Sequence, residues 1–429
     1  MTSIDNSSLR IIDPSFDKSN FRVEFKLPTD TVLLSNLRVV NVGISSTVAD
    51  SYSPTLGTYG AIKAIYLYNG AELLDSVRDF NTYSSFKNLN KTNDANISQN
   101  RWLNYVGVGF VQSGSQSYTD PNLDKDDYQL VAQEPVADNL TKSGWLSLNQ
   151  CLPFLRASMI LPTTLFRQLR VVIEYKSAEA LKDAVRDRRD GTLTTDTGTA
   201  LLCDEVDDGD VKAEMIKRYE GVVYHPYEFD RVNLPAVATA ATDDSTKLVR
   251  QSTNNLIHGF NNKKVKRILL VHKPTDSTTW VNGNVNDGYG NNASQALFRN
   301  STQLRINGVN KFAGSGVGSD TGCGQNRRLA LTTDAWGDVN QFPGQNLTQT
   351  QDFNNYVAGA NTLQKTQGAV SYLGCFVEEN INTLQVFVDR TGVHGNTALN
   401  QAIDLNIMAE VEKAVILTQD GRYRVIYTQ

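Results

Sequence analysis

The sequence predicts an all-β protein built from two modules, and three observations carry this prediction. Apolar and polar residues alternate with period two in many short runs, or the runs are continuous and β-branched, as in strands. Turn-forming residues such as Asn, Asp and Gly are abundant, whereas stretches with helical periodicity are rare. The chain has 429 residues. A single hydrophobic core usually stops growing at about 250–300 residues, so this length indicates more than one core.

In the first half, the clearest strand signal is residues 169–175, Leu-Arg-Val-Val-Ile-Glu-Tyr. Residues 21–27 alternate apolar and charged side chains, which is typical of a strand with one face on a core. Residues 61–68 run into Asn69-Gly70, a strong signal for a two-residue hairpin turn. Further strands are expected at 33–44, at 106–111, where two glycines indicate a bend, and at 145–148.

The middle of the chain is the one place where a helix is expected. Residues 177–190 place apolar side chains such as Leu181 and Val185 on one face, and Gly191 follows. An acidic cluster comes next, which could attract a hard cation, although its spacing matches no ordered calcium loop. A flexible acidic loop is therefore favoured. The cluster consists of Asp204, Glu205, Asp207, Asp208 and Asp210.

Strand signals return in the second half, and part of the first-half pattern recurs there. The expected strands are 265–272, 304–306, 384–388, 402–411 and 423–427. Residues 304–306 run into Asn307-Gly308, as 61–68 run into Asn69-Gly70, and each half ends on a strand rich in Arg and Val, at 169–175 and 423–427. We therefore divide the chain into a module at 1–176, a connector helix with an acidic loop at 177–220, and a module at 221–429.

Composition excludes several classes of protein. The formal net charge of −5 lacks the basic surplus of a general nucleic-acid binder, so no sequence-specific contact with nucleic acid is expected. The chain lacks both a signal-peptide pattern at its start and a run of about 20 apolar residues, so we expect synthesis in the cell without secretion. The four cysteines, Cys151, Cys203, Cys323 and Cys375, form no C-x-x-C pair and indicate neither a disulfide framework nor a zinc site.

A search for chemistry finds no catalytic, cofactor-binding or metal-binding residues. No two of the histidines have the spacing of a metal motif, and Cys151 has no neighbouring base to activate it. The glycine-rich stretch 314–324 lacks the Gly-Lys-Ser/Thr ending of a phosphate loop, and no helical pattern follows it directly. The histidines are His225, His258, His272 and His394, and the tryptophans that could stack on sugars are Trp102, Trp145, Trp280 and Trp336.

Long segments without strand signals are the other notable feature, at 112–127, 274–294 and 311–362. Loops longer than about 12–15 residues usually carry function or are covered by partners. An enzyme could use such loops as lids, and a protein that forms a lattice could use them for contacts between subunits.

Two segments resemble a known family. Residues 146–155, Leu-Ser-Leu-Asn-Gln-Cys-Leu-Pro-Phe-Leu, and 161–175, which begins Leu-Pro-Thr-Thr-Leu-Phe-Arg-Gln, are similar to the end of the first barrel in double jelly-roll major capsid proteins of double-stranded DNA viruses. The likeness points to polinton-like viruses and virophages. Residues 61–70 resemble an earlier strand and turn of that barrel, so the resemblance covers mainly residues 1–176.

The resemblance implies two consecutive eight-stranded jelly-roll barrels and a non-enzymatic role in the virion capsid. Three chains would form a pseudo-hexagonal homotrimer, and trimers would tile an icosahedral shell beside minor capsid and penton proteins. Whether an internal membrane lies beneath such a shell stays open.

Two alternatives remain. One is a minor capsid protein, such as a penton or spike subunit, which would usually have one jelly roll and an appended domain. The other is a carbohydrate-binding or carbohydrate-active β protein that uses Trp280 or Trp336 in the long loops.

Overall fold

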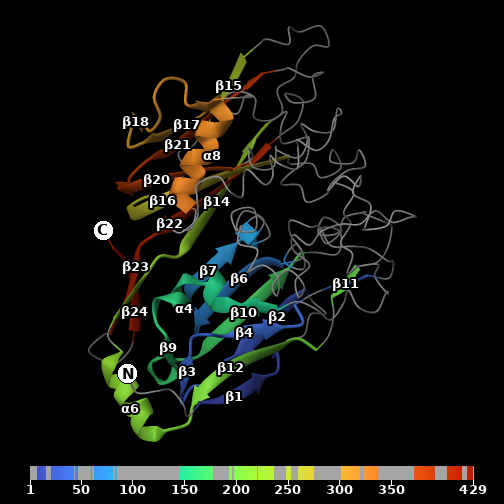
Figure 1. The fold of residues 1–429 in the computed structure, drawn as a ribbon, viewed down its shortest axis with the longest axis vertical. Coiled ribbons are helices and arrows are strands. Elements are labelled where there is room, and N and C mark those ends of the chain that lie inside the picture. The colour runs from blue at the N-terminus through green and yellow to red at the C-terminus, as the bar shows by residue number, and fades with distance from the viewer. Residues whose placement is uncertain are drawn as a thin grey trace, which may run out of the picture.

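The computed structural model (Figure 1) contains two β-barrels that follow one another along the long axis of the molecule. It describes residues 7–15, 21–42, 44–46, 59, 62–80, 83–84, 145–176, 193–195, 198–219, 221–235, 248–252, 259–274, 301–318, 323–336, 372–391, 403–417 and 423–428. The predicted helix at 177–190, the predicted strand at 106–111 and the segment 112–127 lie outside these residues.

The second barrel consists of two antiparallel sheets around one apolar core. One sheet has the order β14 (Tyr227–Leu234), β22 (Ile403–Val411), β16 (Lys263–Pro274) and β20 (Tyr372–Ile381). The other has the order β15 (Leu248–Ser252), β21 (Leu384–Thr391), β17 (Ser301–Ile306) and β18 (Val309–Asn310), and β19 (Val317–Gly318) also pairs with β17. Side chains such as Ile268, Leu304, Val386 and Ile407 fill the space between the sheets.

The first barrel repeats this order of strands. In one sheet, β12 (Ala200–Val206) pairs with β1 (Ser7–Ile12) on one side and with both β3 (Val32–Leu34) and β4 (Arg38–Val40) on the other. Beyond these, β9 (Ile160–Pro162) pairs with β3, and β8 (Trp145–Ser147) pairs with β4. The other has the order β2 (Arg22–Lys26), β10 (Leu169–Tyr175), β6 (Ile62–Asn69) and β7 (Glu72–Arg78). A short pair, β5 (Ile44–Ser46) with β11 (Leu193–Thr195), lies beside them. Such alternation between two sheets is the jelly-roll arrangement.

The two Asn-Gly turns are equivalent, as the sequence predicted. In each barrel the Asn side-chain oxygen accepts hydrogen bonds from two consecutive backbone N–H groups that precede the neighbouring strand. The donors are Arg167 and Gln168 for Asn69, at 2.8 and 3.4 Å, and Asn382 and Thr383 for Asn307, at 2.8 and 3.2 Å. The predicted equivalence of the end strands is wrong, because the topology matches β10 with β21 and not with β24 (Tyr423–Tyr427).

The turns themselves differ in register. Ile306 pairs with Val309, so Asn307 and Gly308 are the two loop residues, both at positive φ (49° and 83°), as a type I′ turn requires. In the first barrel Asn69 pairs with Glu72, which shifts the loop to Gly70 and Ala71. Asn69 therefore ends β6, and Gly70, with φ of 61°, supplies the left-handed residue.

The predicted flexible loop at 204–210 is wrong. Residues 200–206 form β12, which pairs with β1 on one side and with β3 and β4 on the other, so it is an inner strand of the first barrel. Helix α6 (Gly209–Arg218) follows, and the Asp208 carboxylate caps it by accepting from the backbone N–H groups of Asp210 and Val211. An acidic residue in the first turn and basic residues in the last turn complement the helix dipole.

Three other features differ from the sequence-based expectation. The run 33–44 is interrupted and contributes to the separate strands β3, β4 and β5. Helix α8 (Cys323–Trp336) begins within the last residues of the glycine-rich stretch 314–324, where no helix was expected, and lies within the predicted long loop 311–362. Short helices α3 (Leu148–Cys151), α4 (Pro153–Ala157) and η5 (Thr163–Leu165) occupy the connection from β8 to β10.

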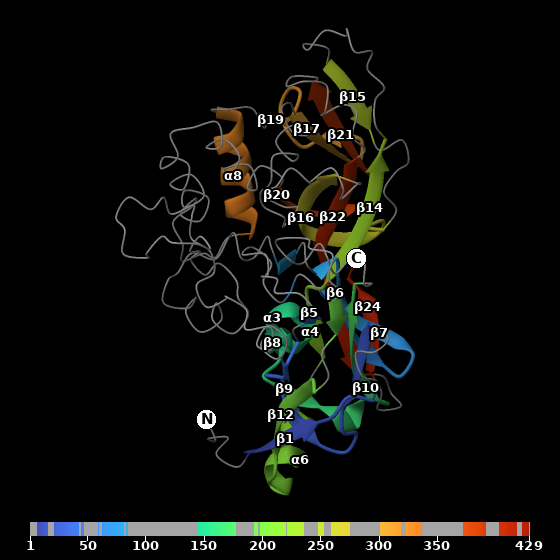
Figure 2. The ribbon, with the colours of Figure 1, turned by 90° about the vertical axis from the view of Figure 1, so that its right-hand side faces the viewer.

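A third, smaller sheet joins the two barrels. It consists of β13 (Val222–Tyr224), β23 (Lys413–Leu417) and β24, and β23 lies between the other two strands. This C-terminal sheet runs from the upper barrel down toward α6 (Figures 1 and 2). Among the described helices, none has the length and apolar character needed to cross a lipid bilayer.

Candidate assembly surfaces and the junction between the barrels

Two members of the acidic cluster singled out in the sequence, Asp204 and Glu205, form ion pairs with arginine side chains. Glu205 accepts from Arg10 Nη1 at 2.9 Å, and Asp204 accepts from Arg38 Nη2 at 3.1 Å. Burial acts to raise the pKa of Glu205, but hydrogen bonds from Thr31 and Arg10 outweigh it and lower the pKa. Within the described ranges, no three His, Cys, Asp or Glu side chains are grouped as a metal site requires. The cluster therefore holds β12 to its neighbours.

The other candidate residues do not meet in one place. His225 Nε2 lies 3.6 Å from Glu412 Oε2, and His272 lies in β16 opposite Leu405. Burial raises the pKa of Cys203 to about 11 and that of Cys375 to about 12, so both are neutral thiols at pH 7. The remaining candidates are Cys151, which is buried in α3, Cys323, which begins α8, Trp145, which begins β8 and is half-buried, and His258, His394, Trp102 and Trp280, which lie outside the described residues.

Trp336 ends α8 and belongs to the junction between the barrels. Its side chain is buried, its ring stacks on Tyr227 at 5.9 Å, and Nε1 donates to the Ile268 carbonyl at 3.1 Å. The Arg267 guanidinium lies 4.2 Å above the ring. A buried ring of this kind offers no face to a sugar, which removes one of the two residues that the carbohydrate alternative named.

The junction itself is a continuous apolar core. Strand β16 alternates between two environments: Ile268 and Leu270 face the core of the second barrel, whereas Leu269 and Val271 join the core that contains the first barrel. Burial on both faces explains why this strand is a continuous apolar run in the sequence. Tyr83 from the first half contacts Tyr227 at 5.2 Å between ring centroids. The two barrels therefore share packed surface.

The C-terminal sheet docks on the first barrel through aromatic side chains. Tyr423 stacks on Phe166 with ring centroids 5.2 Å apart and an angle of 15° between the rings. Tyr224 meets Phe154 edge to face at 5.2 Å, and its hydroxyl donates to the Leu74 carbonyl. Edge-to-face and stacked pairs of this kind contribute about 0.5–1.5 kcal/mol each beyond the area they bury.

A buried carboxyl lies beneath this sheet. Asp75 is 1% exposed and accepts from the backbone N–H of Phe154 at 2.7 Å and of Ser76 at 2.9 Å. Burial raises the pKa of Asp75 to about 7, although the two hydrogen bonds and Lys413 act to lower it. Asp75 is thus protonated in part of the molecules at neutral pH.

A half-buried charge network holds the last strand. Glu228 Oε1 accepts from the Tyr427 hydroxyl at 2.5 Å and lies 3.4 Å from Lys413 Nζ and 3.6 Å from Lys263 Nζ. Both ammonium groups lie 4.5 Å from the centre of the Tyr427 ring. Burial acts to raise the pKa of Glu228, but Lys413 and its other donors lower it, so the carboxylate stays charged at pH 7.

Two of the exposed apolar surfaces on the described residues are candidates for contact with other chains. On the outer face of the C-terminal sheet, Val223 and Ile426 flank Ala414 in one row, and both are exposed, at 55% and 37%. On the first barrel, Leu9 and Ile11 project from β1 and are 58% and 63% exposed. Within the described residues β1 pairs only with β12, so it is an edge strand.

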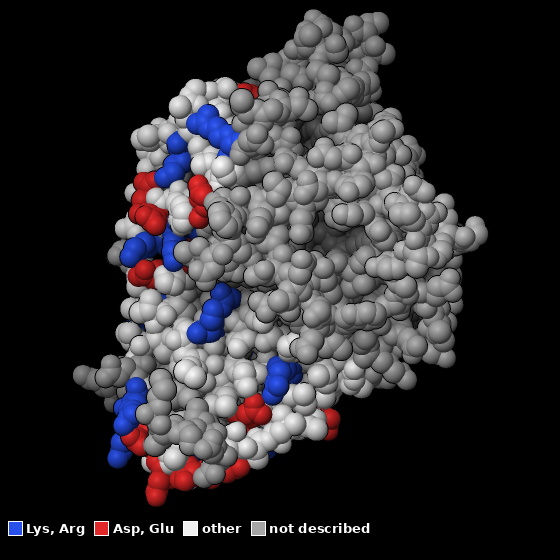
Figure 3. All heavy atoms as spheres, in the orientation of Figure 1, with Lys and Arg blue, Asp and Glu red and all other residues white. Residues whose placement is uncertain are grey.

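The described surface carries charges of both signs. On the face drawn in Figure 3, Lys and Arg side chains alternate with Asp and Glu side chains and form no large field of one sign. The described part of this face therefore offers no broad basic area to a polyanion. Copies of the chain could approach without strong mutual repulsion.

No family model and no curated protein matches the sequence, but solved structures match over nearly its whole length. The mavirus major capsid protein has a TM-score of 0.55 at 10% identity, covering 98% of this chain and 90% of that one. A chain of the Sputnik virophage has a TM-score of 0.54 at 10% identity, covering 99% and 88%. The Faustovirus major capsid protein has a TM-score of 0.53 at 7% identity, covering 96% and 90%. This chain therefore has the double jelly-roll fold of viral major capsid proteins.

Proposed function

We propose that this protein is a major capsid protein whose copies form pseudo-hexagonal homotrimers that tile an icosahedral virion shell. The observation that carries the proposal is the presence of two barrels with the same strand order in one chain, a fold it shares with the mavirus and Faustovirus major capsid proteins. The role is structural and requires no catalytic residues. The partners are further copies of the chain, and minor capsid and penton proteins at other positions of the shell.

The junction supports this role because a lattice subunit must hold its two barrels at a constant relative position. The shared core around β16 and the docked C-terminal sheet bury apolar surface on both sides of the boundary. The exposed Leu9, Ile11, Val223 and Ile426 are surface that assembly would cover. We also propose to extend the first unit from 176 to 206, since β12 is an inner strand of that barrel.

The alternatives have less support. A penton or spike subunit with one jelly roll and an appended domain does not match two barrels with corresponding strand orders. A carbohydrate-active protein needs an exposed aromatic platform or a pair of free carboxylates. Of the two tryptophans that this alternative named, Trp336 is buried in the junction, and the acidic cluster at 204–208 is engaged by Arg and Asn side chains and by the cap of α6.

The experiment is to measure the mass of the purified chain and to image it. Light scattering should give three times the 47.4 kDa chain mass, and electron micrographs should show particles with six-fold-like outlines. A species that stays monomeric at micromolar concentration would overturn the proposal. A five-fold ring would favour the penton alternative.

A further inference from the structure

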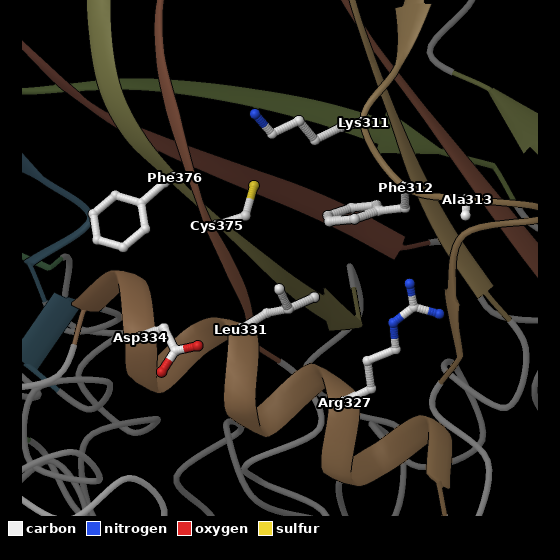
Figure 4. A pocket seen from close by; sticks show the side chains of 8 residues that line it. All are labelled: Lys311, Phe312, Ala313, Arg327, Leu331, Asp334, Cys375 and Phe376. Carbon is white, nitrogen blue, oxygen red and sulfur yellow. The ribbon is translucent and has the colours of Figure 1, made fainter.

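A pocket of about 410 Å³ opens on the flank of the second barrel. It lies between α8 and the loop that follows β18, and it is bounded by β20, an end strand of one sheet (Figure 4). Its volume falls in the range of sites that hold small ligands or one to two peptide side chains. The capsid role proposed above does not use this pocket.

Both walls of the pocket are held in place by buried hydrogen bonds. The buried Gln303 side chain forms two hydrogen bonds with the backbone of Phe312. Its Oε1 accepts from Phe312 N at 3.0 Å, and its Nε2 donates to Phe312 O at 2.7 Å. Helix α8 is fixed to β20 through Thr332, whose hydroxyl accepts from Gly374 N at 2.8 Å. A ligand would therefore enter a preformed site and would spend little binding energy on ordering it.

The lining of the pocket is mainly apolar. Phe312 and Cys375 are buried, Leu331 is half-buried against the barrel core, and Phe376, on the opposite face of β20 from Cys375, is 42% exposed. The thiol of Cys375 is neutral at pH 7, so it acts as part of the apolar floor. An apolar group of the ligand would cover the exposed part of Leu331.

Two positively charged side chains also line the pocket. Lys311 and Arg327 come from opposite walls, are exposed, and form no ion pair with any residue that the structure describes. Elsewhere in the described chain, Arg10, Arg170 and Arg267 each bind a carboxylate. Asp334, seven residues after Arg327 on the same face of α8, lies at the other end of the pocket (Figure 4).

We propose that this pocket binds a peptide segment of another polypeptide in which a carboxylate side chain stands next to a large apolar one. The apolar side chain packs against Phe312 and Leu331, and the carboxylate pairs with Lys311 and Arg327. Asp334 accepts from an N–H or an ammonium group further along the segment. A fatty acid, whose polar atoms lie at one end, leaves Asp334 without a donor.

The test uses the full chain and the fluorescein-labelled peptide Gly-Asp-Phe-Gly-Lys, with binding followed by fluorescence anisotropy. We expect saturable binding at a Kd below about 1 mM. Lys311→Gln combined with Arg327→Gln should weaken binding at least about tenfold, because two charge-assisted contacts are lost. Arg424→Gln, at an exposed position on β24, is the matched control and should change the Kd less than about twofold.

Three results would overturn the proposal. One is the absence of saturable binding up to about 1 mM peptide. Another is an unchanged Kd in the double variant, with thermal unfolding confirming that the variant is folded. The third is equal binding of the peptide with Asn in place of Asp together with displacement by decanoate, which would indicate a site for acyl chains.

Discussion

Asp75 predicts a dependence of stability on pH that one substitution should remove. The carboxyl is buried beneath the C-terminal sheet, and its surroundings raise its pKa from the ordinary 3.8 to about 7. Lys413 and Glu228 act on it electrostatically in opposite directions, and the Tyr224 hydroxyl binds the adjacent carbonyl of Leu74. The folded chain thus retains a proton that the unfolded chain loses at lower pH.

The sign and size of the effect follow from this difference. Below about pH 4 both states hold the proton, and Asp75 does not alter the free energy of unfolding. Between about pH 4 and 7 the folded state holds more protons, so stability falls by up to about 1.4 kcal/mol per pH unit. A pKa difference of about 3 corresponds to a total loss of roughly 4 kcal/mol above pH 7.

Asp75→Asn removes the charge but keeps one acceptor. The amide oxygen can still accept from Phe154 N, whereas the amide nitrogen would face Ser76 N, at a loss of about 1–2 kcal/mol. We therefore expect the variant to be less stable than the natural chain at pH 4.5 and more stable by roughly 2–3 kcal/mol at pH 8. The two curves of stability against pH should cross.

The assay is urea unfolding at several pH values between 4.5 and 8, at one protein concentration because assembly would add its own stabilisation. Asp334→Asn, at an exposed carboxyl, serves as the control and should follow the natural chain at every pH. Curves of the natural chain and Asp75→Asn that run parallel across this range would refute the reasoning.

Three further predictions concern packing, a turn and assembly. Gly374→Ala would place a Cβ 2.5 Å from Trp336 Cδ1 and should lower the free energy of unfolding by about 1–3 kcal/mol in urea, whereas Gly209→Ala, with open space around it, should change it little. Asn307→Ala removes the acceptor of two backbone N–H groups at a residue with positive φ and should cost about 1–3 kcal/mol by the same assay; an unchanged midpoint would contradict the role of the turn. Ile426→Lys should reduce the fraction of trimer in light scattering with unfolding within about 0.5 kcal/mol of the natural chain, and full trimer formation would exclude this sheet face from the interface.

Strands were predictable where the signal is local. Alternation or a continuous β-branched run identified β2, β6, β10, β16, β17, β21, β22 and β24, because each strand has at least one face on a core. Helix α6 was missed although Asp208 and the basic residues at its end are ordinary capping signals, since the concentration of acidic residues suggested a solvated loop. Helix α8 buries a short face around Thr332, Ala335 and Trp336, which leaves little apolar periodicity to detect.

The sequence did not predict the candidate site. The sequence contains no metal or catalytic spacing that would have pointed to a site. The pocket beside α8 was not predictable, since its residues come from three separate segments around 311–313, 327–334 and 375–376. The glycine-rich stretch 314–324 is adjacent in sequence to these segments, but no pattern predicted helix α8, which forms one wall of the pocket.

By itself the sequence determined an all-β chain, two modules, and the equivalence of the two Asn-Gly turns, because periodicity and turn chemistry act between near neighbours. Tertiary structure alone decided that β12 completes the first barrel and that the last strand docks on that barrel through Tyr423 and Phe166. It also decided that Asp75 is buried beside groups more than 150 positions away in the chain, Glu228 and Lys413. Such contacts form between residues far apart in the chain, so no local pattern specifies them, and their energies depend on burial that only the packed molecule provides.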